Sequence, residues 1–181
     1  MVDMIPSSTR VATRHLSASD PDAYEFRVNS RNSRQQLWEP TGQGSGVRPV
    51  VYTYTHLQVY AFSRDTGVQV GGVVGSSEER SGSRVPTACE RDYEALAARH
   101  PNMKGVVVVM KAFLDEEVRG KGVGLAMYRT LAKEAGRRGF AIVPNECWIG
   151  TPLTSADAKR VWAKLPREPG MDAEGSVVFA P

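Results

Sequence analysis

The 181-residue sequence has few of the residues that build metal or disulfide sites. Its three histidines, His15, His56 and His100, lie far apart, and it contains no CxxC or HExxH motif. Dedicated zinc sites use closely spaced ligands of those kinds, so we expect no metal. The two cysteines, Cys89 and Cys147, are too few for a disulfide framework. We expect both as free thiols in a reducing, cytoplasmic compartment.

Long apolar runs are also missing. No run approaches the roughly 20 residues that span a bilayer, and residues 1–8 lack a basic segment followed by an apolar core. We therefore expect neither a membrane partner nor a signal peptide. The formal net charge is only +3, which by itself is too small an excess to indicate nucleic-acid binding. What remains is the composition of an ordinary globular protein, 41% hydrophobic and 24% charged.

The length fits one well-buried domain and is short for two. We expect residues 1–8 to form a flexible tail and residues 9–181 to form a single domain. The stretch at about 76–104 reads as a helical insertion, because the capping box Thr87-Ala-Cys-Glu90 opens a helix that reaches Arg99.

The first half of the chain predicts helices followed by a hairpin. We expect a strand at 9–16, a helix that begins at Asp20-Pro21, and a short helix at 31–38. Arg27, Arg31 and Arg34 form either a solvated face there or a site for an acidic ligand. A glycine- and proline-rich loop at 39–49 leads into strands at 50–62 and 68–75. The glycines of the second strand indicate a bulge or a close backbone approach.

In the second half, an apolar strand begins at Val106 and is followed by a glycine-rich turn and an amphipathic helix that Gly139 ends. A strand at 140–148 contains Pro144, which predicts a bulge or a splay from its neighbour because proline cannot donate to a ladder. Thr154 or Ser155 caps a last helix that reaches Leu165, and a final strand follows at 175–179.

The turn reads Arg119-Gly-Lys-Gly122-Val-Gly124 and joins the buried strand to the helix. Exposed N–H groups at a helix N-terminus favour an anion, and glycines let that anion approach closely. The spacing excludes the GxGxxG dinucleotide fingerprint. A Walker A loop is excluded because no Lys-Ser/Thr follows the last glycine. The turn therefore predicts a phosphate or pyrophosphate site.

This motif resembles the Arg/Gln-x-x-Gly-x-Gly/Ala sequence of the GCN5-related N-acetyltransferases, in the same strand–helix setting. Ser155-x-x-Ala158-x-x-Val161-Trp162 is similar to the first half of the family's later Asn-x-x-Ala-x-x-Leu-Tyr helix. The resemblance implies an α/β (α+β) fold. That fold has a mixed, mostly antiparallel sheet of six to seven strands with a splayed parallel pair, flanked by four to five helices.

The resemblance also implies acetyl-CoA as the acyl donor, with its pyrophosphate on the glycine-rich turn and its pantetheine arm along the preceding strand. An amine would attack the thioester directly in a ternary complex, and a backbone N–H would stabilise the oxyanion. The residues that the resemblance assigns to the cofactor are Phe113, Leu114, Val118, Arg119, Gly120, Lys121, Gly122, Val123, Gly124, Ser155 and Trp162.

Two positions depart from the family pattern. Trp162 stands where many members have a tyrosine that acts as general acid, and an indole N–H is a poor acid. The strand that begins at Val106 has valines where many members carry a glutamate base. Glu146 is the nearest candidate base by sequence, although it also reads as a surface carboxylate. Glu79 and His56 are weaker candidates.

Two hypotheses follow. The chain is an N-acetyltransferase for a small-molecule or macromolecular amine acceptor, or it is a catalytically degenerate module of the same fold that binds nucleic acid or a protein partner. The intact turn favours the enzyme, whereas Trp162 and the missing glutamate favour the binding module. The sequence leaves monomer and homodimer both open.

Overall fold

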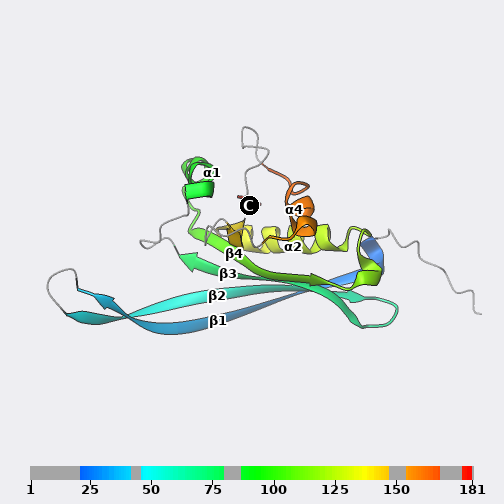
Figure 1. The fold of residues 1–181 in the computed structure, drawn as a ribbon, viewed down its shortest axis with the longest axis horizontal. Coiled ribbons are helices and arrows are strands. Elements are labelled where there is room, and N and C mark those ends of the chain that lie inside the picture. Colours follow the sequence, from blue (N-terminus) through cyan, green and yellow to red (C-terminus); the bar gives the residue numbers. More distant parts are fainter. Residues whose placement is uncertain (1–20, 42–45, 80–86, 147–153, 168–176, 181) are drawn as a thin grey trace, which may run out of the picture.

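The computed structural model describes residues 21–41, 46–79, 87–146, 154–167 and 177–180. Within them a mixed sheet carries three α-helices (Figure 1). The elements in chain order are η1 (Pro21–Ala23), β1 (Tyr24–Pro40), β2 (Val47–Ser63), β3 (Gln69–Glu79), α1 (Thr87–Arg99), β4 (Gly105–Leu114), η2 (Glu116–Val118), α2 (Val123–Arg137), β5 (Phe140–Pro144) and α4 (Ala156–Trp162).

The five strands lie side by side in sequence order, β1-β2-β3-β4-β5. The first three pairings are antiparallel and only β4 and β5 run parallel. An isolated antiparallel bridge joins Ile142 to Val178 at the outer side of β5. This arrangement confirms the expected mixed, mostly antiparallel sheet with one parallel pair.

The helices expected between Asp20 and Trp38 are wrong, because this part of the chain forms the single 17-residue strand β1 after a short 3-10 turn. β1 pairs with β2 without interruption, from Tyr24↔Ser63 to Pro40↔Val47. The loop expected at 39–49 is correspondingly shorter. The polar, arginine-rich sequence has weak helix propensity, and a long partner strand overrides it. The strand expected at 9–16 lies outside the described residues.

Later elements agree better with the sequence. The helix at Thr87–Arg99, the strand that contains Val106 and the helix that Gly139 follows are all confirmed. The bulge or close approach expected among the β3 glycines is confirmed: Ala61 pairs with Gly71 and Phe62 with Gln69, so Val70 is an extra residue on β3 next to Gly71. β5 stops at Pro144, so the strand expected to continue to 148 is too long.

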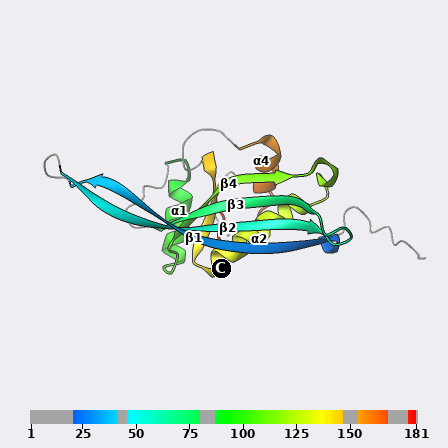
Figure 2. The same ribbon diagram turned by 90° about the horizontal axis from the view of Figure 1, so that it is seen from below.

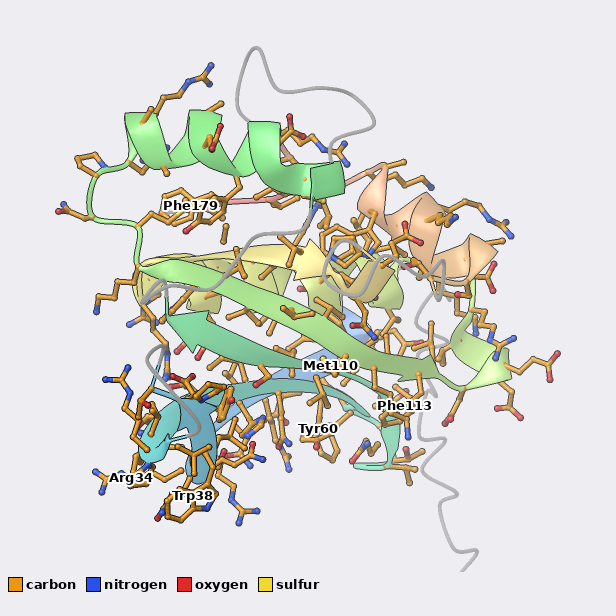
Figure 3. The ribbon with its side chains drawn as sticks, turned by 60° about the vertical axis from the view of Figure 1, so that its left-hand side comes forward. Arg34, Trp38, Tyr60, Met110, Phe113 and Phe179 are labelled. Atoms are coloured by element: carbon orange, nitrogen blue, oxygen red, sulfur yellow. The ribbon has the colours of Figure 1, made fainter. Side chains whose placement is uncertain are left out.

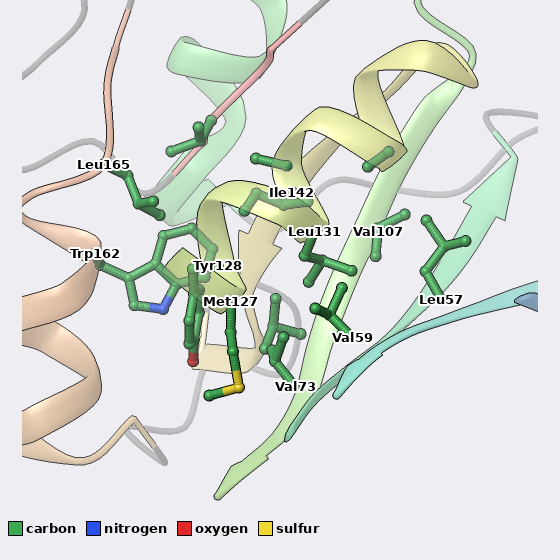
Figure 4. Close-up of a cluster of buried hydrophobic side chains, with 14 of the residues drawn as sticks. Leu57, Val59, Val73, Val107, Met127, Tyr128, Leu131, Ile142, Trp162 and Leu165 are labelled. Carbon is green, nitrogen blue, oxygen red and sulfur yellow. The ribbon is translucent and has the colours of Figure 1, made fainter. Parts of the chain in front are cut away.

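Two apolar cores lie on the two faces of β4 and β5. On one face, α2 packs against β2, β3 and β5, and α4 packs against α2; the fully buried side chains there include Leu57, Val59, Val107, Leu131 and Ile142 (Figure 4). On the other face, α1 packs through Tyr93 and Leu96 against Val106, Val108 and Val143. Alternation along β4 explains this division, because successive strand residues point to opposite faces.

The expectation of a free thiol at Cys89 is wrong, because this cysteine is disulfide-bonded. It is buried in α1, within the second core. The sequence contains one other cysteine, Cys147, which lies outside the described residues. A disulfide needs Cα atoms about 4.4–6.8 Å apart, a condition that tertiary structure sets and that sequence spacing does not reveal.

The outer half of the β1–β2 hairpin projects from the molecule as a two-stranded ribbon (Figures 1 and 2). β2 pairs with β3 only from Thr55 to Phe62, so the eight pairs from Ser33↔Tyr54 to Pro40↔Val47 have no third strand beside them in the described sheet. We call this segment, Ser33–Pro40 with Val47–Tyr54, the arm. Separately, none of the helices that the structure describes is long and apolar enough to cross a membrane.

Candidate functional site

The parallel pair of strands separates at a defined point. β4 and β5 are paired from Gly105↔Phe140 to Val109↔Pro144, and β4 then continues alone on that side as far as Leu114. Along the described chain, the edge of Met110–Leu114 that faced β5 therefore has no strand partner. This matches the separation expected at Pro144, although the strand ends there and does not bulge.

A bulge lies instead on β4. Val74 pairs with Lys111 and Gly75 with Val109, so Met110 has no opposing residue on β3. A bulge re-aims the backbone of the extra residue, and such irregularities recur beside active sites. Met110 thus sits at the point where β4 has lost its regular partners on both sides. The run of valines in the sequence gave no signal of this position.

The glycine-rich turn directly follows the open edge. Gly120 and Gly122 adopt left-handed backbone conformations with φ of 76° and 82°, which side-chain-bearing residues rarely adopt. Gly122 is the N-cap of α2 and supplies no side-chain cap to the first turn. The N–H groups of that turn, at Val123 and Gly124 among others, are left for another acceptor. The turn thus has the geometry of an anion site.

The side chains around this turn carry both signs of charge. Arg119 is exposed and donates through Nε to the carbonyl oxygen of Leu114, 3.3 Å away. Lys121 is half-buried. Asp115, Glu116 and Glu117 precede the turn, are exposed, and line an open hollow of about 610 Å³. Arg119 and Lys121 therefore supply the positive charge, while the three carboxylates form an acidic rim on the strand side.

The two strand-end residues that were assigned to the cofactor point to opposite faces. Leu114 packs toward α2, and its Cδ2 lies 3.9 Å from where a Cβ on Gly124 would be. Phe113 lies on the other face, 40% exposed. A Cβ on Gly72 would lie only 2.8 Å from Phe113 Cε1 and 2.8 Å from Tyr60 Cδ1, so both rings rest on this glycine. Figure 3 shows Tyr60, Met110 and Phe113 close together on this face.

Four more of the residues predicted to bind the cofactor make contacts within the chain itself. Val118 and Val123 are buried in the core beneath the turn. Ser155 is the N-cap of α4, and its hydroxyl accepts a hydrogen bond from the Ala158 N–H at 3.2 Å, which confirms the expected helix start. Trp162 is buried and meets Tyr128 edge-on, with ring centroids 5.4 Å apart (Figure 4). Their contact with acetyl-CoA stays a prediction.

Tyr128 is a chemical group that the sequence did not single out. It lies on the buried face of α2, and burial raises the pKa of its phenol to about 12. The phenol is therefore neutral and protonated across the physiological range. Its ring lies against Trp162, the position where the resemblance implies a tyrosine, so a phenol lies beside that position.

Glu146 follows β5 by two residues, at the end where the strands separate. Its Oε2 atom is buried and has no hydrogen-bond partner among the described residues. The Lys159 ammonium on α4 lies 3.8 Å from this atom, which is ion-pair distance but longer than a hydrogen bond. The buried Oδ1 of the neighbouring Asn145 also has no hydrogen-bond partner in the part of the chain that the structure describes. A buried oxygen without a hydrogen-bond donor is energetically costly. The two oxygens of Asn145 and Glu146 are therefore available to accept hydrogen bonds from a ligand.

The weaker candidates lie elsewhere. His56 on β2 shares a 2.8 Å hydrogen bond with the Ser33 hydroxyl at the base of the arm. Glu79 is the last residue of β3, where it pairs with Gly105 at the far end of β4 from the open edge. No group of three or more potential metal ligands occurs in the parts of the chain that the structure describes.

No family model matches the chain, and no curated protein matches it. Among solved structures, the chain matches in part a protein assigned as arylalkylamine N-acetyltransferase 7 of the yellow fever mosquito. The identity is 11%, the TM-score is 0.38, and the match covers 71% of this chain and 76% of the mosquito chain.

Proposed function

We propose that this protein is an acyltransferase that moves the acetyl group of acetyl-CoA to an amine. The observation that carries the proposal is the sequence of three features along one stretch: β4 loses its parallel neighbour after Val109, bulges at Met110, and ends in a turn whose glycines expose a helix N-terminus. A long, thin ligand with an anionic end suits an open strand edge that leads to an anion site.

In this proposal the pyrophosphate accepts hydrogen bonds from the first turn of α2, and Arg119 and Lys121 supply positive charge. The pantetheine amides pair with the open edge of Met110–Leu114, in the way that an extended peptide adds to a sheet edge. The thioester then lies near the bulge. This assignment uses the backbone more than the side chains, so the absence of a glutamate in β4 does not weaken it.

The chemistry requires an oxyanion donor, a base and an acid. The re-aimed backbone at Met110 is our candidate oxyanion donor. Glu146 takes the proton that the amine loses as its nitrogen bonds to the acetyl carbon. As the carbon–sulfur bond breaks, the thiolate of CoA takes up a proton; Tyr128 is our candidate donor, because its ring lies against Trp162, where the resemblance implies a tyrosine acid.

Binding of the donor is tested by thermal unfolding with acetyl-CoA. A ligand that binds only the folded state stabilises it by about 2.7 kcal/mol at a hundredfold excess over Kd, so the melting temperature rises. Gly122→Glu abolishes the shift, because its carboxylate occupies the phosphate position. Gly67→Glu is the matched control: Gly67 also has a positive φ and open surroundings but lies in the β2–β3 turn. An unchanged shift in the Gly122 variant refutes the turn as the donor site.

The role of Glu146 is tested by the pH dependence of the rate, with CoA release from a panel of amines as readout. Glu146→Gln lowers the rate and removes the acidic limb of the profile if this carboxylate is the base. Glu94, exposed on α1, supplies the control substitution Glu94→Gln. A profile that keeps its acidic limb in the Glu146 variant assigns the base to another group.

A further inference from the structure

The arm presents apolar side chains to solvent on one face. Trp38 is 64% exposed, Val47 58% and Val51 60%. Because Trp38 pairs with Pro49, and residues two apart on a strand share a face, these three side chains lie together. A two-stranded ribbon is marginally stable in water, and clustered apolar surface of this kind marks an interaction site. The arm therefore has the properties of an interface element.

Arg34 extends the same face of the arm with a positive charge. It lies four residues before Trp38 on β1, and it is exposed with no ion pair among the described residues. The other two charges of the arm, Glu39 and Arg48, lie 4.0 Å apart and offset one another. The apolar face of the arm therefore lies beside one guanidinium that has no ion-pair partner among the described residues. A partner surface that covers this face is expected to place a carboxylate next to Arg34.

A second exposed apolar surface lies on the body of the same chain, next to an acidic segment. It consists of Tyr60, Met110 and Phe113, on the face of the sheet opposite α2; we call it the aromatic face. Met110 is 54% exposed and Phe113 40%. The acidic rim of Asp115, Glu116 and Glu117 directly follows it, and no ion pair to these three carboxylates occurs in the described ranges.

The arm cannot reach the aromatic face of its own chain. It leaves the sheet where Thr55 pairs with Ser77, whereas Phe113 pairs with Gly72 near the opposite end of β3. At roughly 3.3 Å per residue, these two ends of β3 lie about 17 Å apart, and the arm extends about 25 Å further away. Figure 3 shows Arg34 and Trp38 on the arm well separated from Met110 and Phe113.

We propose that two copies of this chain form a reciprocal homodimer, in which the arm of each copy lies on the aromatic face of the other. Trp38, Val47 and Val51 cover Tyr60, Met110 and Phe113 of the second copy, and Arg34 meets the acidic rim. The two arms are exchanged between the same two copies, so the contacts close under a two-fold axis and do not propagate into a filament.

This arrangement brings the arm of one copy to the open edge of β4 in the other. Trp38 and Arg34 then form a wall of the candidate acetyl-CoA site that the single chain leaves open. The inference itself rests on the two surfaces and not on the acyltransferase proposal, so either can fail without the other. Apolar burial supplies the affinity, and the charge pairing fixes which surfaces meet.

The first test measures mass by analytical ultracentrifugation over a concentration series. The full chain is dimeric, and Trp38→Ser raises the dissociation constant a hundredfold or more because two indoles leave the interface. Val51→Ser raises it about tenfold. Val68→Ser is the matched control, since Val68 is 59% exposed but lies in the β2–β3 turn, outside both surfaces; it leaves the constant unchanged. A monomer at every concentration overturns the proposal, as does equal weakening by the Val51 and Val68 variants.

The second test reverses the charges of the two surfaces. Its readout is the recovery of dimerisation in a mixture of two variants, which a folding defect cannot produce. Arg34→Glu and Glu116→Arg each weaken the homodimer at least tenfold, because like charges then face each other twice. When the two variants are mixed, both contacts of the mixed dimer pair opposite charges, so dimerisation is restored. A mixture no tighter than its components overturns the assignment of these two surfaces. So does a chain that stays monomeric alone and shifts only when duplex DNA is added.

Discussion

The two halves of the β1–β2 hairpin share one hydrogen-bonded ladder but have opposite surroundings. In the inner half, Leu57, Val59 and Ala61 have no exposed surface, because α2 covers them. In the arm, Val47 and Val51 are each about 60% exposed. The difference shows that strand pairing alone extends a ribbon well beyond the body of the molecule. Only a helix or another surface packed on the ribbon turns its apolar residues into a core.

The largest expected difference between the two halves is in the loss of stability when a leucine side chain is truncated in each. Leu57→Ala removes a fully buried side chain and is expected to lower the free energy of unfolding by about 2–5 kcal/mol. Leu37→Ala in the arm, where the side chain is 38% exposed, is expected to change it by less than about 1 kcal/mol at concentrations that keep the protein monomeric. Urea unfolding measures both. Equal losses would mean that the arm has a core of its own.

The buried phenol of Tyr128 makes the free energy of unfolding depend on pH, which tests how completely the body of the molecule excludes water. Burial raises its pKa to about 12, whereas an unfolded tyrosine titrates near 10. Between these values the unfolded chain binds fewer protons than the folded one, so stability is complete below pH 10 and is lost as the pH rises to 12. The expected loss is about 2–3 kcal/mol, and it is absent in Tyr128→Phe. Urea denaturation of the parent protein and of Tyr128→Phe at pH 9 and pH 11.5 checks this. If both proteins lose the same free energy of unfolding between these pH values, the phenol is exposed to water.

A smaller effect is expected where α4 begins to cover the body. Ser155→Ala removes the hydroxyl that accepts the Ala158 N–H, and the expected cost is about 1 kcal/mol in the free energy of unfolding. Ser155→Asp retains an acceptor at the N-cap and is expected to leave stability close to that of the parent protein. If the alanine and aspartate variants unfold alike, the cap contributes nothing and Trp162 alone holds α4 in place.

The sequence predicted the strand and helix around the glycine-rich turn better than it predicted the fold of residues 21–40. The glycine turn between a buried strand and an amphipathic helix was read correctly, because Gly120, Gly122 and the apolar periodicity are local signals. β1 was read as helices because its polar residues carry no strand alternation. Its conformation comes from pairing with β2, a contact that the local pattern does not record.

The bulge at Met110 and the contact between Tyr128 and Trp162 were beyond sequence reasoning for a related reason. Both depend on how neighbouring elements meet: β4 against β3, and α2 against α4. The disulfide at Cys89 is a third case, since it requires another cysteine brought within reach by the fold.

By itself, then, the sequence determined the glycine-rich turn, the strand before it and the helix after it, because backbone freedom at glycine and side-chain periodicity act within a few residues. Tertiary structure alone decided where β4 becomes an open edge, which residues reach it, and that half of the hairpin projects into solvent. Those features depend on which strand ends first in a ladder, and ladder lengths are set by contacts between residues distant in the chain.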